Sequence, residues 1–481
     1  MEKLKNKLKA FFGTYKRVNA AVIATALALV VLLNVAITAL SQAFSLYFYA
    51  APKYSHNVGQ GTLSFLEEVK EENDHVRILF CMQKEELESD TIYNLVYQTA
   101  MQLAEAFSFI SVETVNIFTD PEAIEPYKYK TVDGERVKVN DISKLSVIVD
   151  GSADFSVQSL SSFFVLDAEG AIDSYNGEEI FAALIRYTLS RTHKTAYYTT
   201  SHGEKASSSL FNLLTCAGYT PKAIDLMTET PTDTSGVLVI SNPAYDFIRG
   251  AEGVDAEIEK LRAYMASGGL VLACLDPLST GLVNLDALLA ENGLSRTDAI
   301  IKDTDKSVTV DGYSLVLSFG ESEVAKALKE TATAYNRARV ITREASVIET
   351  SGSATALLFS SASSKAYTAG KVSSNEGNFA VAALSQNEAG GGVFLSSGYY
   401  IAASDVLETD DYGNEEFFYA LLSLARGDKV PLGATMVALD NALLQDLTVR
   451  QARLWAVLVV VLIPCAAVCV GLVTLRRRRL R

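Results

Sequence analysis

Cysteine is scarce in this chain, and so are histidine and tryptophan. There are five cysteines, four histidines and one tryptophan among 481 residues. Cys465 and Cys469 lie in one long apolar run, and the other three, Cys81, Cys216 and Cys274, form no C-x-x-C pair. We therefore expect no disulfide framework, and we expect these three to be buried free thiols that pack as small apolar side chains.

Motifs for metal, nucleotide and hydrolytic chemistry are also missing. The histidines show no paired ligand spacing, so the sequence predicts no metal and no other cofactor. No G-x-x-x-x-G-K-[ST] run occurs, since Gly370-Lys371 is followed by Val372, and no G-x-S-x-G elbow occurs. The chain therefore cannot hold nucleotide phosphates in a P-loop, and we predict no catalytic residues and no enzyme activity.

Charge is distributed unevenly along the chain. The net charge is −15, but residues 1–19 and residues 476–481 each carry +5, which leaves −25 on the residues between them. A surface this acidic repels phosphate backbones, so nucleic acid is disfavoured as a partner.

Two long uncharged apolar runs, Ala20–Ala43 and Trp455–Leu475, lie near the two ends. Each exceeds the ~20 residues that a helix needs to cross a bilayer. Their basic flanks face the termini, and Lys and Arg are retained on the cytoplasmic side during insertion. The sequence thus predicts a two-pass protein of the plasma membrane, with both termini cytoplasmic and residues 44–454 outside. The alternative for the first run is a cleaved signal peptide, but it is longer than the ~7–15-residue apolar region of such peptides.

The predicted organisation has seven segments. They are a basic amphipathic cytoplasmic segment (1–19), a transmembrane helix (20–43), a first extracytoplasmic α/β domain (44–192), a second one (193–430), a connector (431–454), a second transmembrane helix (455–475) and a basic cytoplasmic tail (476–481).

In the first domain we expect a strand at Val76–Met82, a helix at Asp90–Phe107 and a strand at Ile110–Phe118. A polar stretch then leads to strands at Leu145–Val149 and Phe163–Leu166 and to a helix at Glu178–Ser190. The order β-α-β followed by β-β-α is that of a thioredoxin-like fold, here without the redox cysteine pair.

The second domain alternates apolar strands with helices, as a parallel sheet requires. We expect strands at Thr195–Thr199, Gly236–Ser241 and Gly269–Leu275, with helices at Ser207–Ala217 and Ala256–Ser267 between them. Later strands extend this sheet or form a third lobe, and a helix follows. These are Val308–Phe319, Thr355–Phe359, Phe379–Leu384, Gly392–Ser397 and the helix Glu415–Ala425.

Polar residues follow the three parallel strands, where loops of a doubly wound sheet converge. The candidate ligand-binding residues are His202, Gly203, Glu204, Asn242 and Asp276. They suit hydrogen bonding to a polar small molecule or a sugar. The alternative is that they serve only as turn and helix-cap residues.

The acidic run Asp405–Glu416 lacks the ligand periodicity of a calcium loop. We expect a solvated loop here, with Asn414 capping the helix that follows.

Several short motifs occur in a characteristic order. They are Thr62-Leu63-Ser64-Phe65-Leu66, Asp120-Pro121-Glu122, Tyr175-Asn176-Gly177-Glu178, Ser201-His202-Gly203-Glu204, Tyr264-Met265-Ala266-Ser267-Gly268-Gly269 with Asp276-Pro277, and Gly413-Asn414-Glu415-Glu416-Phe417-Phe418. Together with the two terminal runs, this series resembles the GldG-like auxiliary components of ABC transporters, over most of residues 57–430. Ser201 replaces the first glycine of the family's histidine motif, and Gly398-Tyr399-Tyr400 stands where relatives often have an acidic loop.

The resemblance implies association with an ABC-2-type permease and a separate cytoplasmic ATPase. It also implies a sheet related to glutamine-amidotransferase-like or sugar-binding domains, and the predicted fold class of the second domain is an amidotransferase-like or Rossmann-like parallel sheet. The sequence leaves two other hypotheses open. One is a surface carbohydrate-binding protein or hydrolase acting at the His202, Glu204 and Asp276 crevice, and the other is a surface ligand receptor without transport.

Overall fold

The computed structural model describes residues 56–439, except 133–134, 139, 167–169, 171, 206, 251–255, 335–338, 375, 410 and 435. These residues belong to one compact unit. Both predicted transmembrane helices, both basic terminal segments and the connector beyond residue 439 lie outside this part of the chain. None of the helices within it combines the length and the hydropathy that crossing a bilayer requires.

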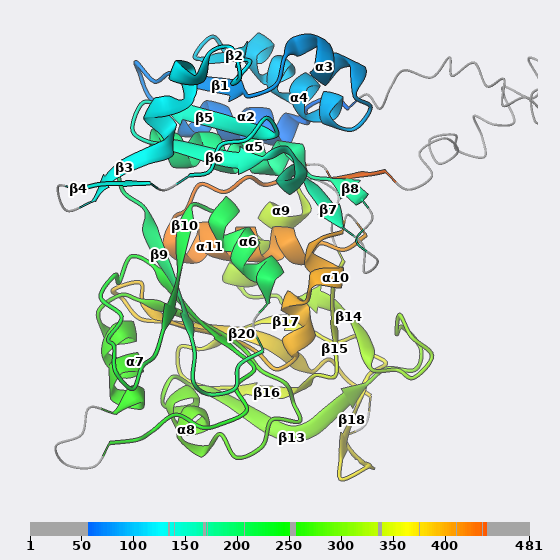
Figure 1. Cartoon of the computed structure of the whole chain (residues 1–481). Coiled ribbons are helices and arrows are strands. Elements are labelled where there is room, and N and C mark those ends of the chain that lie inside the picture. The colour runs from blue at the N-terminus through cyan, green and yellow to red at the C-terminus, as the bar shows by residue number, and fades with distance from the viewer. Residues whose placement is uncertain are drawn as a thin grey trace, which may run out of the picture. The chain divides into compact units, whose positions relative to one another are not determined.

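The first sheet lies in the upper part of Figure 1 and has the strand order β2-β1-β5-β6. Strands β1 and β2 are parallel, whereas β1 and β5, and β5 and β6, are antiparallel. Its strands are β1 (Val76–Phe80), β2 (Ile110–Thr114), β5 (Ser146–Gly151) and β6 (Phe155–Ser159). Its helices are α2 (Gln60–Val69), α3 (Lys84–Ser89), α4 (Tyr93–Ala106) and α5 (Gly177–Leu189).

Two expectations for this stretch need correction. The strand predicted at Phe163–Leu166 exists as β7 (Phe164–Leu166), but it pairs with β8 (Ile172–Tyr175) in a separate sheet, which β22 (Val437–Ala438) completes. Strand β6 takes its place in the first sheet. The half-buried sequence of β6 gives it little of the apolar signal that marks a central strand.

The predicted polar stretch between β2 and β5 contains structure of its own. It includes the 3-10 helix η1 (Pro121–Lys128) and a hairpin of β3 (Tyr129–Val132) and β4 (Glu135–Lys138). Another 3-10 helix, η2 (Leu160–Phe163), follows β6.

The second sheet has nine strands in the order β10-β9-β11-β12-β21-β20-β17-β14-β15. The first five strands in this order pair with one another in parallel. The remaining pairings, from β21–β20 to β14–β15, are antiparallel. The parallel strands are β9 (Lys194–Thr199), β10 (Tyr219–Ile224), β11 (Val237–Ser241), β12 (Leu270–Cys274) and β21 (Gly392–Ser396). The antiparallel ones are β14 (Ser314–Phe319), β15 (Val340–Arg343), β17 (Thr355–Phe359) and β20 (Ala380–Gln386). Of the two alternatives predicted for the later strands, extension of the sheet and a third lobe, the first is confirmed for β14, β17, β20 and β21.

Helices cover both faces of this sheet, so that β11 and β12 are buried throughout. One face packs against α6 (Ser208–Cys216), α9 (Glu323–Thr333) and α11 (Asn414–Arg426), and the other against α7 (Glu257–Ala266) and α8 (Val283–Glu291). A further sheet has the order β16-β13-β18-β19. Its strands are β13 (Leu294–Lys302), β16 (Ser346–Thr350), β18 (Lys365–Thr368) and β19 (Lys371–Ser374).

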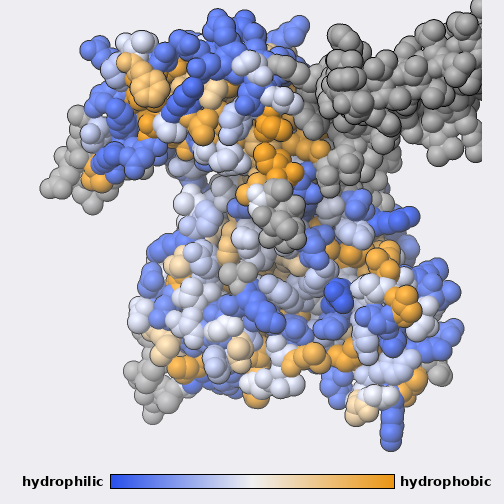
Figure 2. Space-filling model, turned by 45° about the vertical axis from the view of Figure 1, so that its right-hand side comes forward, coloured by the Kyte–Doolittle hydropathy of each residue, from blue (hydrophilic) through white to orange (hydrophobic). Residues whose placement is uncertain are grey.

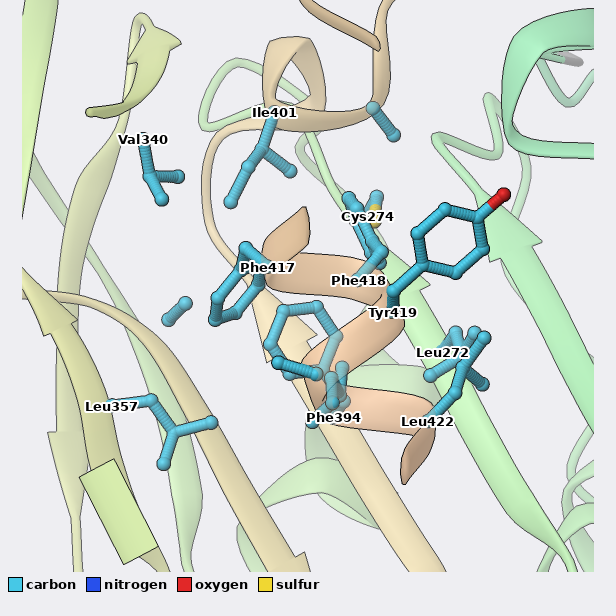
Figure 3. Close-up of a cluster of buried hydrophobic side chains, with 14 of the residues drawn as sticks. Leu272, Cys274, Val340, Leu357, Phe394, Ile401, Phe417, Phe418, Tyr419 and Leu422 are labelled. Carbon is cyan, nitrogen blue, oxygen red and sulfur yellow. The ribbon is translucent and has the colours of Figure 1, made fainter. Parts of the chain in front are cut away.

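The main core lies where α11 crosses the sheet (Figure 3). Phe417 and Phe418 of α11 pack against Phe394 of β21, with ring centroids 5.8 Å and 6.0 Å apart. All three side chains are fully buried. Helix α11 ends at Arg426 and is followed by Gly427, whose φ of 65° is the left-handed conformation that glycine adopts at helix C-termini.

Asn414 does not cap α11, contrary to the prediction. Gly413 occupies the N-cap position, and the Asn414 side chain is fully buried. Its Oδ1 accepts the Ile341 N–H at 3.0 Å, and its Nδ2 donates to the Ile341 and Ile401 carbonyls, both at 2.9 Å. The preceding acidic run is not a solvated loop throughout, because Val406 and Leu407 are buried in the short helix α10 (Ser404–Leu407).

Cys81, Cys216 and Cys274 are free cysteines. Burial raises the pKa of the Cys81 thiol to about 11 and that of Cys274 to about 12. Both therefore remain protonated at neutral pH and pack as small apolar side chains. The face of the molecule in Figure 2 is largely hydrophilic, with apolar residues gathered in several small groups.

Candidate functional site

The predicted site residues lie where the parallel strands β9, β11 and β12 end. The loop after β9 turns sharply, because Ser201 and Gly203 both have positive φ, of 81° and 67°. This turn directs the His202 carbonyl toward the loop after β11, where the Ala244 and Tyr245 N–H groups donate to it at 2.8 Å and 2.9 Å. The two loops therefore close against each other.

The His202 side chain points inward and is only 4% exposed. Its Nε2 lies 3.1 Å from Oε2 of Glu257, and its Nδ1 lies 3.2 Å from the Thr200 carbonyl and 3.4 Å from Oε1 of Glu204. Its ring stacks on Phe247, with centroids 4.1 Å apart and an angle of 19° between the planes. The imidazole is thus held on every side by protein groups.

Two carboxylates set the charge of this histidine. Burial alone would lower the pKa of His202, but hydrogen bonds and charge interactions with Glu204 and Glu257 outweigh it and raise the pKa to about 9. The pKa of Glu204 is lowered. Burial alone would raise it, but hydrogen bonds outweigh burial, the first of them being the one with the His202 side chain. His202 is therefore an imidazolium at neutral pH, which cannot act as a general base.

Glu257 is the member of this cluster that the sequence analysis missed. It is the first residue of α7, is 1% exposed, and accepts the Ile248 N–H at 2.7 Å. The sequence shows Glu257 only as an acidic residue in the first turn of a predicted helix. Such residues are common because a negative charge there interacts favourably with the helix dipole, so this position alone does not indicate a partner for His202.

Asn242 and Asp276 form a second cluster. Oδ1 of Asn242, whose φ is 44°, accepts the Asp276 N–H at 3.1 Å and the Ser279 hydroxyl at 2.7 Å. Oδ1 of Asp276 accepts the Leu278 N–H at 2.8 Å, as in an Asx turn. These are contacts of the kind expected if Asn242 and Asp276 serve as turn residues, which is the alternative to ligand binding.

The strand-end residues thus meet in two groups rather than around one crevice. His202 and Glu204 meet Glu257, whereas Asp276 borders a separate cavity of about 250 Å³ that Arg343, Tyr399 and Tyr400 also line. Among the described residues, no hydrogen bond joins His202 or Glu204 to Asp276. Gly203 provides a turn, and a Cβ there would lie 3.0 Å from the Cβ of Ala244.

The described residues also contain no cluster of three or more side chains suited to hold a metal ion. Cys274, the last residue of β12, has a thiol that is protonated and fully buried. The arrangement is that of a buried, charge-paired cluster with hydrogen-bonding turns beside it.

No protein-family model matches the chain, and no curated protein matches its sequence. Remote similarities to solved structures cover about half of it. The mmIFT52 N-terminal domain is 15% identical, with 48% of this chain and 97% of that chain covered and a TM-score of 0.37. PurLQS from Thermotoga maritima is 11% identical, with 48% and 99% covered and a TM-score of 0.28. The carbohydrate deacetylase Agd3 is 14% identical, with 49% and 32% covered and a TM-score of 0.28. TM-scores this low say nothing about function. The mixed α/β fold with parallel strands follows from the sheet topology itself.

Proposed function

We propose that this protein is a membrane-anchored auxiliary subunit, without ATPase activity, of an ABC-2-type transport system. In this proposal the two α/β domains lie outside the cell, where they contact other subunits or bind a ligand. The two terminal apolar runs hold them at the membrane, and a permease and a separate cytoplasmic ATPase are the partners.

The observation that carries the proposal is the succession of two α/β sheets between the two apolar runs. The order β2-β1-β5-β6, with one parallel and two antiparallel pairings, agrees with a thioredoxin-like domain. Five parallel strands flanked by helices agree with an amidotransferase-like or Rossmann-like domain. The second of these sheets is of the kind that the resemblance to GldG-like proteins implies, and the first agrees with the element order read from the sequence.

The chemistry at the strand ends supports a role without catalysis. His202 is buried and protonated, and it pairs with Glu204 and Glu257, each of which also accepts a backbone N–H through Oε2 while its Oε1 is buried without a hydrogen-bond partner. A surface carbohydrate-binding protein or hydrolase would need His202, Glu204 and Asp276 to face one accessible crevice. The geometry favours that alternative less.

Co-purification tests the proposal. The full-length protein, tagged and solubilised from its native membranes in a mild detergent, should bring a permease and an ATPase with it, as identified by mass spectrometry. A matched variant in which unrelated apolar helices replace residues 20–43 and 455–475 separates contacts made by the spans from contacts made by the domains. Repeated recovery of the wild-type protein alone would refute the proposal.

Topology is tested separately. Protease added to intact protoplasts should digest the region between the two apolar runs and leave tags at both termini intact. Protection of that region would place the domains on the other side of the membrane, where they could not act as proposed.

A further inference from the structure

A cavity of about 470 Å³ lies apart from the strand-end clusters. Residues of β6, β7, α5 and α6, and residues near α10 and α11, line it, together with Met436. The first and second α/β domains therefore both contribute to it. Its volume is in the range of about 300–1,000 Å³ that is usual for small-molecule sites.

Much of the cavity wall is apolar. Val165, Leu166, Ile180, Leu184, Leu213 and Leu407 are among its lining residues. Leu166, which is 56% exposed, contributes apolar surface that is open to a ligand. A ligand with an apolar body fits this wall.

The charged lining residues are all acidic. Glu179, Glu408 and Glu415 line the cavity, and no Lys, Arg or His is among its described lining residues. Glu179 is only 5% exposed, and its carboxylate accepts hydrogen bonds from the Tyr419 hydroxyl and the Asn176 amide, both of which are neutral donors. Each carboxylate oxygen can accept a further hydrogen bond.

Nearby groups reflect the same negative potential. The pKa of the Cys216 thiol, which lines the cavity, is raised well above its usual value, first by burial and then by Glu179 and Glu415. The Arg186 guanidinium donates instead to the Ala217 carbonyl and is not a lining residue. A buried carboxylate is stabilised best by a cation beside it.

An independent observation comes from Ser209. Its side chain lines the cavity and is 3% exposed, yet its hydroxyl oxygen has no hydrogen-bond partner. Buried polar atoms are almost always satisfied, so this hydroxyl, on a residue of the cavity wall, is available to a group bound there.

We propose that this cavity binds a small organic ammonium ion that has an apolar body. The ammonium group donates hydrogen bonds to the Glu179 carboxylate and the Ser209 hydroxyl, and the apolar body packs against the leucine-rich wall. The proposal goes beyond the auxiliary-subunit function and does not depend on it, because binding is measured on the purified chain without permease or ATPase.

Three probes with the same apolar body test the proposal. They are 2-phenylethylammonium, the neutral 2-phenylethanol and the anionic 3-phenylpropanoate, each titrated by calorimetry into the full-length protein in lipid nanodiscs, with empty nanodiscs as the blank. The ammonium should bind at least about tenfold more tightly than the alcohol, and the carboxylate should be weakest. Equal affinity for the ammonium and the alcohol would overturn the proposal.

Variants locate the binding. Glu179→Gln keeps an acceptor for the Tyr419 hydroxyl and should weaken ammonium binding about tenfold while changing alcohol binding by less than about threefold. Ser209→Ala should weaken ammonium binding about fivefold. The control is Glu113→Gln on β2, whose carboxylate is 52% exposed and pairs with Arg77.

If Glu179→Gln does not fold, as judged by circular dichroism, Ser209→Ala and Glu415→Gln carry the test. Unchanged ammonium affinity in every folded variant would overturn the proposal, and so would an equal loss in Glu113→Gln.

Discussion

The Thr62 hydroxyl donates a 2.6 Å hydrogen bond to Oε2 of Glu178. Both side chains are fully buried, and the same carboxylate also accepts the Gly59 N–H at 3.0 Å and contacts Nε2 of His56. Helix α2, the first described helix, is thereby attached to the N-terminus of α5. Each of the two residues belongs to one of the short motifs that the sequence analysis singled out, so two of these motifs meet in the fold.

Thr62→Val should therefore destabilise the protein although it preserves shape. Removing a buried donor from a buried carboxylate should lower the free energy of unfolding by about 1.5–3 kcal/mol. Pulse proteolysis across a urea series on the full-length protein measures this. Glu72→Gln, at an exposed position just after α2, is the control and should change stability by less than about 0.5 kcal/mol. Equal stability of Thr62→Val and wild type would show that the hydrogen bond contributes nothing net.

The His202 cluster predicts a pH dependence of stability. The pKa of His202 is about 9 in the folded protein and ~6.5 for an unperturbed histidine, so the folded state holds the proton more tightly. Its contribution is fully present below pH ~6.5 and is lost as pH rises through about 9. We expect the free energy of unfolding to fall by at most about 3 kcal/mol over this window because of His202.

His202→Gln should abolish that part of the slope, and Glu257→Gln should reduce it, when urea midpoints are compared between pH 6 and pH 9.5. The matched control is His75→Gln, at an exposed position before β1. A slope that is the same in His202→Gln and wild type would contradict the assignment of an imidazolium to this site.

The aromatic cluster of Figure 3 should dominate stability of the second sheet. Phe417 has no exposed surface and contacts Phe418, Phe394 and Phe319 with ring centroids 5.6–6.2 Å apart. Phe417→Ala should cost about 3–5 kcal/mol, through lost burial and an unfilled cavity. Phe118→Ala, at a side chain that is 78% exposed, should stay within about 0.5 kcal/mol of wild type. A loss below about 1 kcal/mol in Phe417→Ala would mean that the core collapses around the vacancy.

The strongest predictions from sequence concern the central parallel strands. Apolar runs bounded by polar turns indicated β9, β11 and β12 to within a residue or two, because strands covered on both faces are largely apolar, most clearly in β11 and β12. Helices α5, α6 and α7 were found equally well from their periodicity. Edge strand β10 was missed, since its four central residues are exposed and include Pro221 and Lys222, which break the apolar pattern of a strand.

Predictions of side-chain contacts were less complete. Topology brings strand ends to one edge, so the neighbourhood of His202, Glu204, Asn242 and Asp276 was predictable. The division of these residues into two clusters was not, because it depends on Glu257, a residue 53 positions after Glu204 in sequence. Local preference alone cannot show which distant carboxylate approaches a buried imidazole.

Asn414 shows the same limit and gives a final prediction. Asparagine is a preferred helix N-cap, yet this one joins the Ile341 backbone of β15 and the Ile401 carbonyl to the start of α11 through three hydrogen bonds. Asn414→Ala would leave an N–H and two carbonyls buried without partners, so stability should fall by at least about 2 kcal/mol. Asn414→Asp should cost at least as much, because it keeps the acceptor but loses both donors and buries a charge.

Gln98→Ala, on the exposed face of α4, is the control for a polar-to-alanine change in a helix and should be nearly neutral. Urea midpoints of the three variants decide between the two roles. A simple N-cap lost from α11 would cost only ~1 kcal/mol, and the aspartate would restore it because Asp caps as well as Asn. A stable Asn414→Asp variant would therefore return this residue to the capping role, whereas destabilisation by both substitutions would establish it as the link between β15, Ile401 and α11.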